Sequence, residues 1–357
     1  MVKRCIALVL CGVLLAACAR DAAPSAAPEG TGGPDQTGGE QPADSSSATA
    51  ESISLDLYSC CVSGTEMGIW VALDNGIFEA HGLDVNYTVL PPPTGLQAIT
   101  AGDVQIGTDS PGSLVNAVAG GAEDLAFVSG NVSRPVYRIM TGAGLDSPED
   151  LRGRRIGVSG KWAAPAVAVM NYMDRELGMQ LDVDYETVPF RTISDILPAL
   201  EGGVIDAGVL STPLHLQAEQ AGLTTVVNLA DTFDEANAWI VTSGSFAAEN
   251  PEAVTRFLRA YVEAMGIVRD DPATAIASVK QHVEGISDEG AEVTYEEYAD
   301  LMSVDMSVQA LEPYARYTDN PAVGEVDLEQ LIDYSYLEQL EESGFLEEHG
   351  VELQADG

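Results

Sequence analysis

The sequence AITAGDVQIG at residues 98–107 returns without a gap as ALEGGVIDAG at residues 199–208. A shorter match precedes it, because LDVNY at residues 83–87 returns as LDVDY at residues 181–185. Each copy has the order expected of a strand, a short helix, a glycine that ends the helix in the left-handed conformation, and a buried strand. The chain therefore contains one structural unit twice.

A strand-helix-strand unit places its strands in parallel within one sheet. In the first copy we expect strands at residues 83–89 and 104–108, with a helix at residues 94–101 between them. Such sheets bind ligands beyond the carboxyl ends of their strands. Two copies predict two α/β lobes whose strand ends meet at a ligand cleft.

A serine follows the last strand of each copy, Ser110 in the first and Ser211 in the second. We expect each to cap the next helix, so that its hydroxyl and the first backbone N–H groups point towards the cleft. Thr94 is expected to cap the helix of the first copy in the same way. Because one group can serve as both cap and ligand donor, all three residues are candidate ligand contacts.

The chain is strongly acidic, with 56 Asp and Glu, 16 Lys and Arg, and a formal net charge of -40 over 357 residues. This charge repels phosphate backbones and excludes nucleic acid as a partner. A solvated, soluble surface accounts for most of the acidity. The length allows two domains, each with its own core.

The N-terminus has the organisation of a lipoprotein precursor. Lys3 and Arg4 precede an apolar stretch too short to span a bilayer, which predicts a signal peptide at residues 1–17. The sequence LAAC that ends at Cys18 resembles the bacterial lipobox, which implies that Cys18 is lipidated; a chance cysteine beside an ordinary cleavage site is the alternative. Residues 18–51 contain no aromatic and no aliphatic side chain larger than Ala after Cys18, so we expect a flexible tether.

The rest of the chain divides into two predicted lobes and a tail. The first lobe comprises residues 52–130 and 237–350, the second residues 131–236, and the tail residues 351–357. The apolar and glycine pattern also predicts one helix at residues 67–79.

Residues 69–85 resemble the opening signature of ABC-transporter substrate-binding proteins for sulfonates, nitrate, taurine and thiamine precursors. Further matches follow in chain order at residues 101–107, 148–158, 203–209 and 250–254. The resemblance implies the type II periplasmic-binding-protein fold, an α/β architecture of two lobes joined by a two-strand hinge with the ligand cleft between them. This agrees with the internal repeat.

The resemblance implies a membrane-anchored extracytoplasmic protein that binds a small solute by lobe closure and delivers it to an ABC permease with its ATPase. We expect a monomer without a cofactor. The alternatives are an anchored sensory module, or an enzyme of thiamine-pyrimidine synthesis. An enzyme is not expected, because no Gly-x-Ser-x-Gly elbow or positioned histidine base occurs. The sequence SCCVSG at residues 59–64 departs from the pattern of thiamine-precursor binders and argues against a pyrimidine.

Candidate ligand residues of the first lobe lie at strand ends. Ser59, Cys60 and Cys61 follow the first strand; the cysteines are either ligand contacts, small buried residues or a vicinal disulfide. Ser129 and Asn131 end the fourth strand and are either ligand contacts or hinge polar groups. No metal site is expected, because the four histidines have no ligand spacing.

Lys161, Trp162 and Arg191 follow strands of the second lobe, and Trp239 lies on the return strand to the first. The second lobe is less acidic than the whole, with 8 Lys and Arg against 15 Asp and Glu at residues 131–235. The two cations favour an organic anion such as a sulfonate as ligand. If they are merely solvated surface charges, Trp162 or Trp239 would instead stack on a neutral or cationic ring, unless Trp239 is a core residue.

Overall fold

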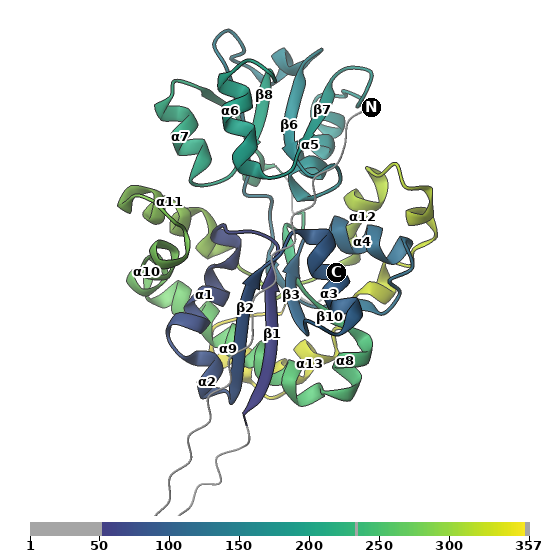
Figure 1. The fold of residues 1–357 in the computed structure, drawn as a ribbon, viewed down its shortest axis with the longest axis vertical. Coiled ribbons are helices and arrows are strands. Elements are labelled where there is room, and N and C mark those ends of the chain that lie inside the picture. Colours follow the sequence, from purple (N-terminus) through teal and green to yellow (C-terminus); the bar gives the residue numbers. More distant parts are fainter. Residues whose placement is uncertain (1–51, 233–234, 354–357) are drawn as a thin grey trace, which may run out of the picture. The chain divides into compact units, whose positions relative to one another are not determined.

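Two five-stranded sheets, each flanked by helices, form the folded part of the computed structural model, which describes residues 52–232 and 235–353 (Figure 1). The strand order is β2-β1-β3-β10-β4 in the first sheet and β7-β6-β8-β5-β9 in the second. The predicted signal peptide, Cys18 and the tether lie outside the described residues.

The first sheet is mixed. Three strands run in parallel: β1 (Ile53–Ser59) lies between β2 (Leu83–Val89) and β3 (Ile106–Asp109). The strand β10 (Ala238–Ser243) is antiparallel to β3 and to its other neighbour, β4 (Leu125–Val132). A strand from late in the sequence therefore completes a sheet that begins at the start of the folded chain.

The second sheet repeats this plan. Here β6 (Arg155–Ser159) lies between and parallel to β7 (Glu186–Phe190) and β8 (Ala207–Leu210). The strand β5 (Arg138–Thr141) is antiparallel to β8 and to β9 (Thr224–Asn228). The chain leaves the first lobe between β4 and β5 and returns between β9 and β10. The prediction of two α/β lobes joined by a two-strand hinge is thus confirmed.

The longer repeat has the predicted structure in both lobes. The helices α3 (Pro92–Ala101) and α6 (Ile196–Glu201) are each followed by a left-handed glycine, Gly102 with φ 81° and Gly203 with φ 67°. The strands β3 and β8 then begin at equivalent positions of the two copies. Glycine is required at both turns because other residues rarely adopt this conformation.

The shorter repeat does not hold, because residues 181–185 form a turn and β7 begins at Glu186. Asp182 has a φ of 62°, a conformation that Asp tolerates better than most residues. The Asp184 carboxylate accepts a hydrogen bond from the backbone of Gln180 at 3.0 Å. Side-chain hydrogen bonding by Asp therefore stabilises a turn where the sequence predicted a strand.

Helices cover both sheets. In the first lobe the predicted helix at residues 67–79 is broken by Gly76, whose φ is 65°, into α1 (Met67–Asp74) and α2 (Ile77–Ala80). The other helices are α4 (Pro111–Ala119), α5 (Ala164–Arg175), α7 (Leu214–Gln220), α8 (Gly244–Glu249), α9 (Pro251–Asp270), α10 (Pro272–His282), α11 (Asp288–Tyr298), α12 (Val308–Arg316), α13 (Ser335–Glu342) and α14 (Phe345–Glu348). None of the described helices has both the length and the apolar character needed to cross a bilayer.

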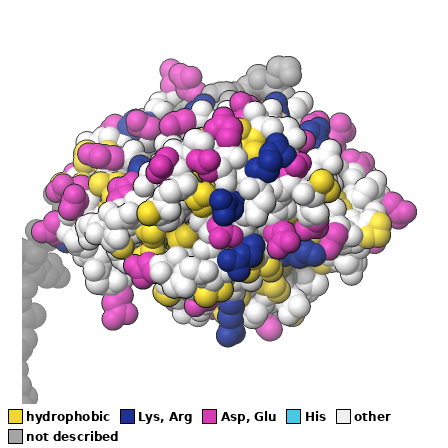
Figure 2. All heavy atoms as spheres, turned by 90° about the horizontal axis from the view of Figure 1, so that it is seen from above, with side chains coloured by type: hydrophobic (Ala, Val, Ile, Leu, Met, Phe, Trp, Pro, Cys, Tyr) yellow, Lys and Arg dark blue, Asp and Glu magenta, His cyan; other side chains and the backbone are white. Residues whose placement is uncertain are grey.

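The surface agrees with the acidic composition. Figure 2 shows Asp and Glu side chains spread over the face that it draws, with Lys and Arg side chains among them. Interspersed charges of this kind are solvated and weakly interacting.

Candidate functional site

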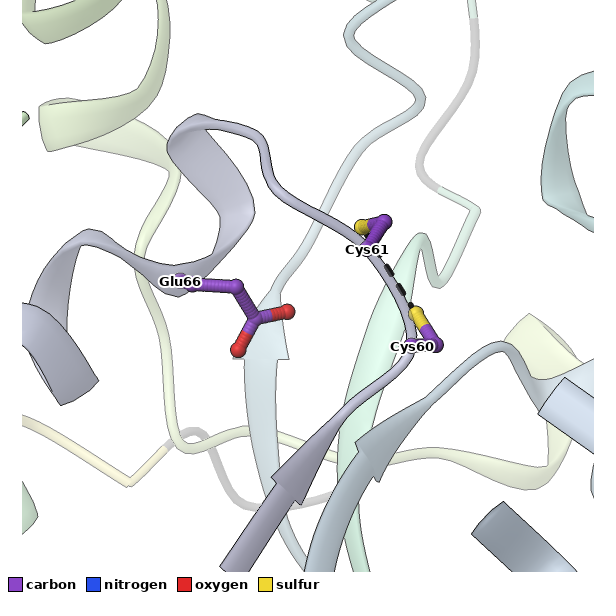
Figure 3. A group of neighbouring side chains, drawn as sticks. All are labelled: Cys60, Cys61 and Glu66. Carbon is purple, nitrogen blue, oxygen red and sulfur yellow. Dashed lines mark hydrogen bonds between the residues drawn. The ribbon is translucent and has the colours of Figure 1, made fainter. Parts of the chain in front are cut away.

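Buried polar side chains gather at the carboxyl ends of β1 and β3. Ser59, Thr108, Asp109 and Glu66 are each fully buried. Glu66 ends a short 3-10 helix, η1 (Gly64–Glu66), which follows the segment that leaves β1. Figure 3 shows its carboxylate pointing towards the segment that carries Cys60 and Cys61. We call this group of residues, with both cysteines, the first-lobe edge.

The Glu66 carboxylate is fixed by its neighbour on β3. Thr108 Oγ1 lies 2.8 Å from each oxygen of the Glu66 carboxylate and donates its hydrogen bond to it. Burial raises the pKa of Glu66 well above its ordinary value, and the nearby Cys61 adds to the rise, while the Thr108 hydrogen bond opposes it. No Lys or Arg occurs between Ser52 and Gly130 to compensate this charge.

Asp109 lies at the N-terminus of α4. Its carboxylate accepts hydrogen bonds from the hydroxyl of Tyr58 at 2.8 Å and from the backbone N–H of Ser110 at 2.7 Å. Burial outweighs these hydrogen bonds and raises the pKa of Asp109 to about 6. An aspartate of the protein itself therefore occupies the position at which the sequence predicted donors for a bound anion.

Cys60 and Cys61 are both free and half-buried, so the alternative of a vicinal disulfide is wrong in this structure. The Cys60 thiol donates to Cys61 Sγ across 3.7 Å. This hydrogen bond lowers the pKa of Cys61 and raises that of Cys60. The backbone between them is held in place, because Ser59 Oγ donates to the Cys61 carbonyl at 3.0 Å and lies 2.6 Å from the hydroxyl of Tyr87.

Ser110 contacts the other lobe instead of capping its own helix. It occupies the N-cap position of α4, but its side chain accepts no hydrogen bond from that helix. Its Oγ accepts from the backbone N–H of Ala164, the first residue of α5, at 3.1 Å. The backbones of the two lobes also approach closely next to Ser110. Gly112 lies so near the Trp162 carbonyl oxygen that an added Cβ would be only 2.3 Å from it. The N-termini of α4 and α5 therefore meet.

The other two predicted caps are also wrong. Thr94 is the third residue of α3, whose N-cap is Pro91, because the proline run starts the helix earlier than predicted. α7 begins at Leu214 with Pro213 as N-cap, and Ser211 precedes it in a turn. The Ser211 carbonyl accepts hydrogen bonds from the backbone of Leu214 and His215, at 2.8 and 3.2 Å.

The candidates near the hinge have structural partners in the first lobe. Ser129 Oγ donates to the Gly130 carbonyl at 2.9 Å, and Asn131 Oδ1 accepts from the Tyr261 hydroxyl at 2.7 Å. Trp239 is 1% exposed and packs edge-on against Phe127, with 5.0 Å between ring centroids. These contacts favour the readings of hinge polar groups for Ser129 and Asn131 and of a core residue for Trp239.

The predicted cations of the second lobe are not directed at the first-lobe edge. Lys161 Nζ lies 2.5 Å from Asp319 Oδ2 and 4.7 Å from the centroid of the Trp162 ring. Trp162 is half-buried and lines a hollow of about 350 Å³ that Asp319 also lines. Arg191 is exposed. One predicted cation is therefore already paired with a carboxylate, and the other faces solvent.

A second contact between the lobes involves Glu297 of α11. Its carboxylate lies 2.5 Å from Arg138 Nη2 and 3.0 Å from His215 Nε2, and it also accepts a hydrogen bond from Thr212. Burial raises the pKa of Glu297, but the hydrogen bonds from His215 and Thr212 outweigh burial, so that the pKa is lowered. The lobes are therefore joined by polar contacts besides the hinge, and the pairs Lys161–Asp319 and Tyr317–Asp174 add further contacts between them.

The family model described as NMT1/THI5 like matches residues 65–275. The chain belongs to the NMT1/THI5-like family. No curated protein matches its sequence.

Solved structures with the same fold include proteins of different kinds. The periplasmic aliphatic sulphonate-binding protein SsuA of Escherichia coli is 16% identical, with a TM-score of 0.62 over 74% of this chain and 90% of that one. The alkanesulfonate-binding protein SsuA of Xanthomonas axonopodis pv. citri, bound to MOPS, is 17% identical, with a TM-score of 0.66 over 80% and 100%. A cysteine-to-serine variant of DSZB with biphenyl-2-sulfinic acid is 17% identical, with a TM-score of 0.60 over 81% and 99%. The predicted periplasmic-binding-protein fold is confirmed.

In this member of the NMT1/THI5-like family, the sequence indicated only part of the first-lobe edge. It identified Ser59, Cys60 and Cys61, but missed Glu66, Thr108 and Asp109. Between the lobes it identified Ser110 but missed Glu297. Asp109 could have been found, because an acid directly before a predicted helix start is a common N-terminal partner. No local sequence pattern pointed to Glu66 or Glu297, because tertiary packing alone decides which side chains surround them.

Proposed function

We propose that this protein is a membrane-anchored extracytoplasmic solute-binding protein, which captures a small solute by closing its two lobes and delivers it to the permease of an ABC importer. The observation that carries the proposal is the polar first-lobe edge, which lies beside the contact of Ser110 with Ala164 of the opposite lobe. Sulfonate-binding proteins of the same fold support it. It acts as a monomer with a permease and its ATPase as partners.

The charges constrain how an anionic solute would bind. A desolvated anion needs donors or cations. The first lobe contributes no Lys or Arg before Gly130, and Asp109 occupies the N-terminus of α4. A sulfonate would therefore direct its charge to the second lobe, towards Trp162 and Arg191, or would need a cation bound at the first-lobe edge. A neutral nitrogen heterocycle would need neither.

Calorimetry and thermal melting of the purified chain test solute binding, with sulfonates, nitrate, taurine, amino acids and pyrimidines as candidates. A solute at a hundredfold excess over its Kd should stabilise the fold by about 2.7 kcal/mol, because it binds only the native state. The radius of gyration should fall on binding, as expected of lobe closure. Formation of product from a bound compound, or no binding across the panel, would contradict the proposal.

Variants of the second lobe locate the solute. Trp162→Ala and Arg191→Ala should weaken binding of a sulfonate roughly tenfold to a hundredfold, because each removes a partner of a desolvated group. Lys280→Ala is the matched control, since Lys280 is an exposed cation paired with Asp288 on the first lobe. Equal losses in all three variants would show a general charge effect and would contradict a second-lobe contact.

Anchoring is tested by the mass of the protein extracted from membranes. We expect Cys18 to be the first residue and to carry diacylglycerol, and Cys18→Ala to release or misprocess the protein. Cys11→Ala is the control and should leave anchoring unchanged. A wild-type protein that is soluble and begins at another residue would contradict the anchor.

A further inference from the structure

Three metal-ligating groups converge at the first-lobe edge. The thiol sulfurs of Cys60 and Cys61 and a carboxylate oxygen of Glu66 all lie within 4.8 Å of one another (Figure 3). From the sequence no metal site was expected, since the four histidines have no ligand spacing. The sequence could not show that η1 brings Glu66 back beside the two cysteines. Two thiols and one carboxylate make a different donor set from the one that was sought.

The distance between the sulfurs fits one tetrahedral ion. Zinc–sulfur bonds of about 2.3 Å at a tetrahedral angle place two sulfurs about 3.8 Å apart. Cys60 Sγ and Cys61 Sγ are 3.7 Å apart. Thiolate ligands favour zinc and other thiophilic ions, and they do not suit calcium or magnesium, which prefer oxygen ligands.

We propose that Cys60, Cys61 and Glu66 bind one thiophilic divalent cation of the zinc type. Three protein ligands leave the fourth tetrahedral position open, as in zinc sites that accept water or a donor atom of a small molecule. If the protein binds a solute as proposed above, an anionic group of that solute could take this position. The metal site itself does not depend on the solute.

Neighbouring side chains orient the ligands as second partners do in metal sites. Thr108 Oγ1 donates to the Glu66 carboxylate at 2.8 Å, and Ser63 Oγ lies 3.5 Å from Cys61 Sγ. Ser59 fixes the Cys61 carbonyl. The ligands are thus held by a polar layer and do not hang from a free loop.

Glu66 has no cationic partner in the described part of the chain. Glu66 is fully buried, and none of the ion pairs among residues 52–232 and 235–353 involves it. A buried carboxylate is costly unless a cation or hydrogen bonds compensate it, and here Thr108 supplies a hydrogen bond alone. The partial exposure of both cysteines leaves a path for an ion from solvent.

The test uses the full chain with both thiols reduced, equilibrated with zinc without any organic solute and analysed for bound metal by mass spectrometry. We expect one ion per chain and, with cobalt instead of zinc, the near-ultraviolet absorption of cobalt–thiolate bonds. Cys61→Ser and Glu66→Gln should each weaken zinc binding at least about tenfold. Thr108→Val should weaken it roughly tenfold to a hundredfold, and Thr108→Ser should restore it.

Two matched controls separate this site from other ligands in the chain. Cys5→Ser/Cys11→Ser/Cys18→Ser removes the other cysteines, and Glu235→Gln removes another buried carboxylate; both should keep one zinc ion. The proposal is overturned if the reduced wild-type chain retains no zinc, or if it shows no cobalt–thiolate absorption, which requires no variant. Since no solute is present, such a result leaves the proposed solute binding standing.

Discussion

The two copies of the repeat end differently at the same strand position. The first ends β3 with Thr108 and Asp109, whereas the second ends β8 with Val209 and Leu210, and all four side chains are buried. Thr108 and Asp109 hydrogen-bond with Glu66 and Tyr58, while Val209 and Leu210 pack in apolar clusters. The repeat therefore supplies the scaffold of both lobes. The two positions where the copies differ give the first lobe its buried polar side chains.

A glycine in each copy takes part in this difference. A Cβ on Gly107 would lie 2.0 Å from the ring of Tyr58, whereas one on Gly208 would lie 2.6 Å from the Cγ2 methyl of Ile196. In the first lobe the glycine makes room for a large aromatic ring whose hydroxyl reaches Asp109. In the second it faces three aliphatic side chains, those of Ile196, Leu200 and Ile205.

The largest difference between the lobes is expected when the stability of Gly107→Ala is compared with that of Gly208→Ala. We expect Gly107→Ala to lower the free energy of unfolding by about 3 kcal/mol or more, because the buried Tyr58 ring has nowhere to move. Gly208→Ala should cost about half as much, since its nearest contact is longer, at 2.6 Å instead of 2.0 Å, and is made by a methyl group instead of a ring. Urea unfolding of both variants measures this, and equal losses would show that the two scaffolds are equally tight.

The second-largest difference is expected in how an acidic side chain of each lobe makes stability depend on pH. The folded pKa of Asp109, about 6, lies above its ordinary value of 3.8, so the folded state binds this proton more tightly than the unfolded state. Stability from this group is therefore complete below about pH 4 and is lost as the pH rises through 6, a loss of about 3 kcal/mol. Asp109→Asn should reduce this fall, and part should remain because the pKa of Glu66 is raised as well.

Asp206 of the second copy is the matched control for this pH profile. Burial opposes ionisation, but hydrogen bonds from Arg155 outweigh it and lower the pKa of Asp206. Its contribution is therefore present above the unfolded pKa and lost as the pH falls. Between pH 4 and 6 we therefore expect Asp206→Asn to leave the pH dependence of the urea midpoint as in the wild type. If it changes this dependence as Asp109→Asn does, the proposed contrast between the lobes is wrong.

The smallest effect is expected at the exposed ion pair that Lys161 of the second lobe forms with Asp319 of the first. Lys161 and Asp319 form an ion pair in which both side chains are more than half exposed. Exposed pairs contribute about 0.2–1 kcal/mol, so Lys161→Ala should change the free energy of unfolding by about 0.5 kcal/mol or less. A double-mutant cycle with Asp319→Asn gives the coupling between the two charges. A coupling above about 2 kcal/mol would contradict a solvated pair.

Local signals explain what the sequence could predict. β2 has the predicted bounds, because a run of strand-forming residues between Gly82 and the prolines at residues 91–93 forms the strand. Hydroxyl caps were predicted wrongly at Ser110 because tertiary contacts offered its hydroxyl a partner in the other lobe. Glu66 was invisible because its surroundings depend on how η1 packs against β3, which no local pattern encodes.

The position of β10 within its sheet bears on the order in which the chain can fold as it is synthesised. All strands of the second sheet come from residues 138–228, so that sheet can form before β10 exists. The first sheet cannot, because β10 is the one strand that pairs along β4. The other edge of β4 is covered later still, by hydrogen bonds of Gly130 with Val304 and of Phe127 with Asp333. When the chain emerges from its N-terminus, the lobe that starts the folded chain is therefore completed last, and both edges of β4 stay unpaired until β10 and residues 304–333 have emerged.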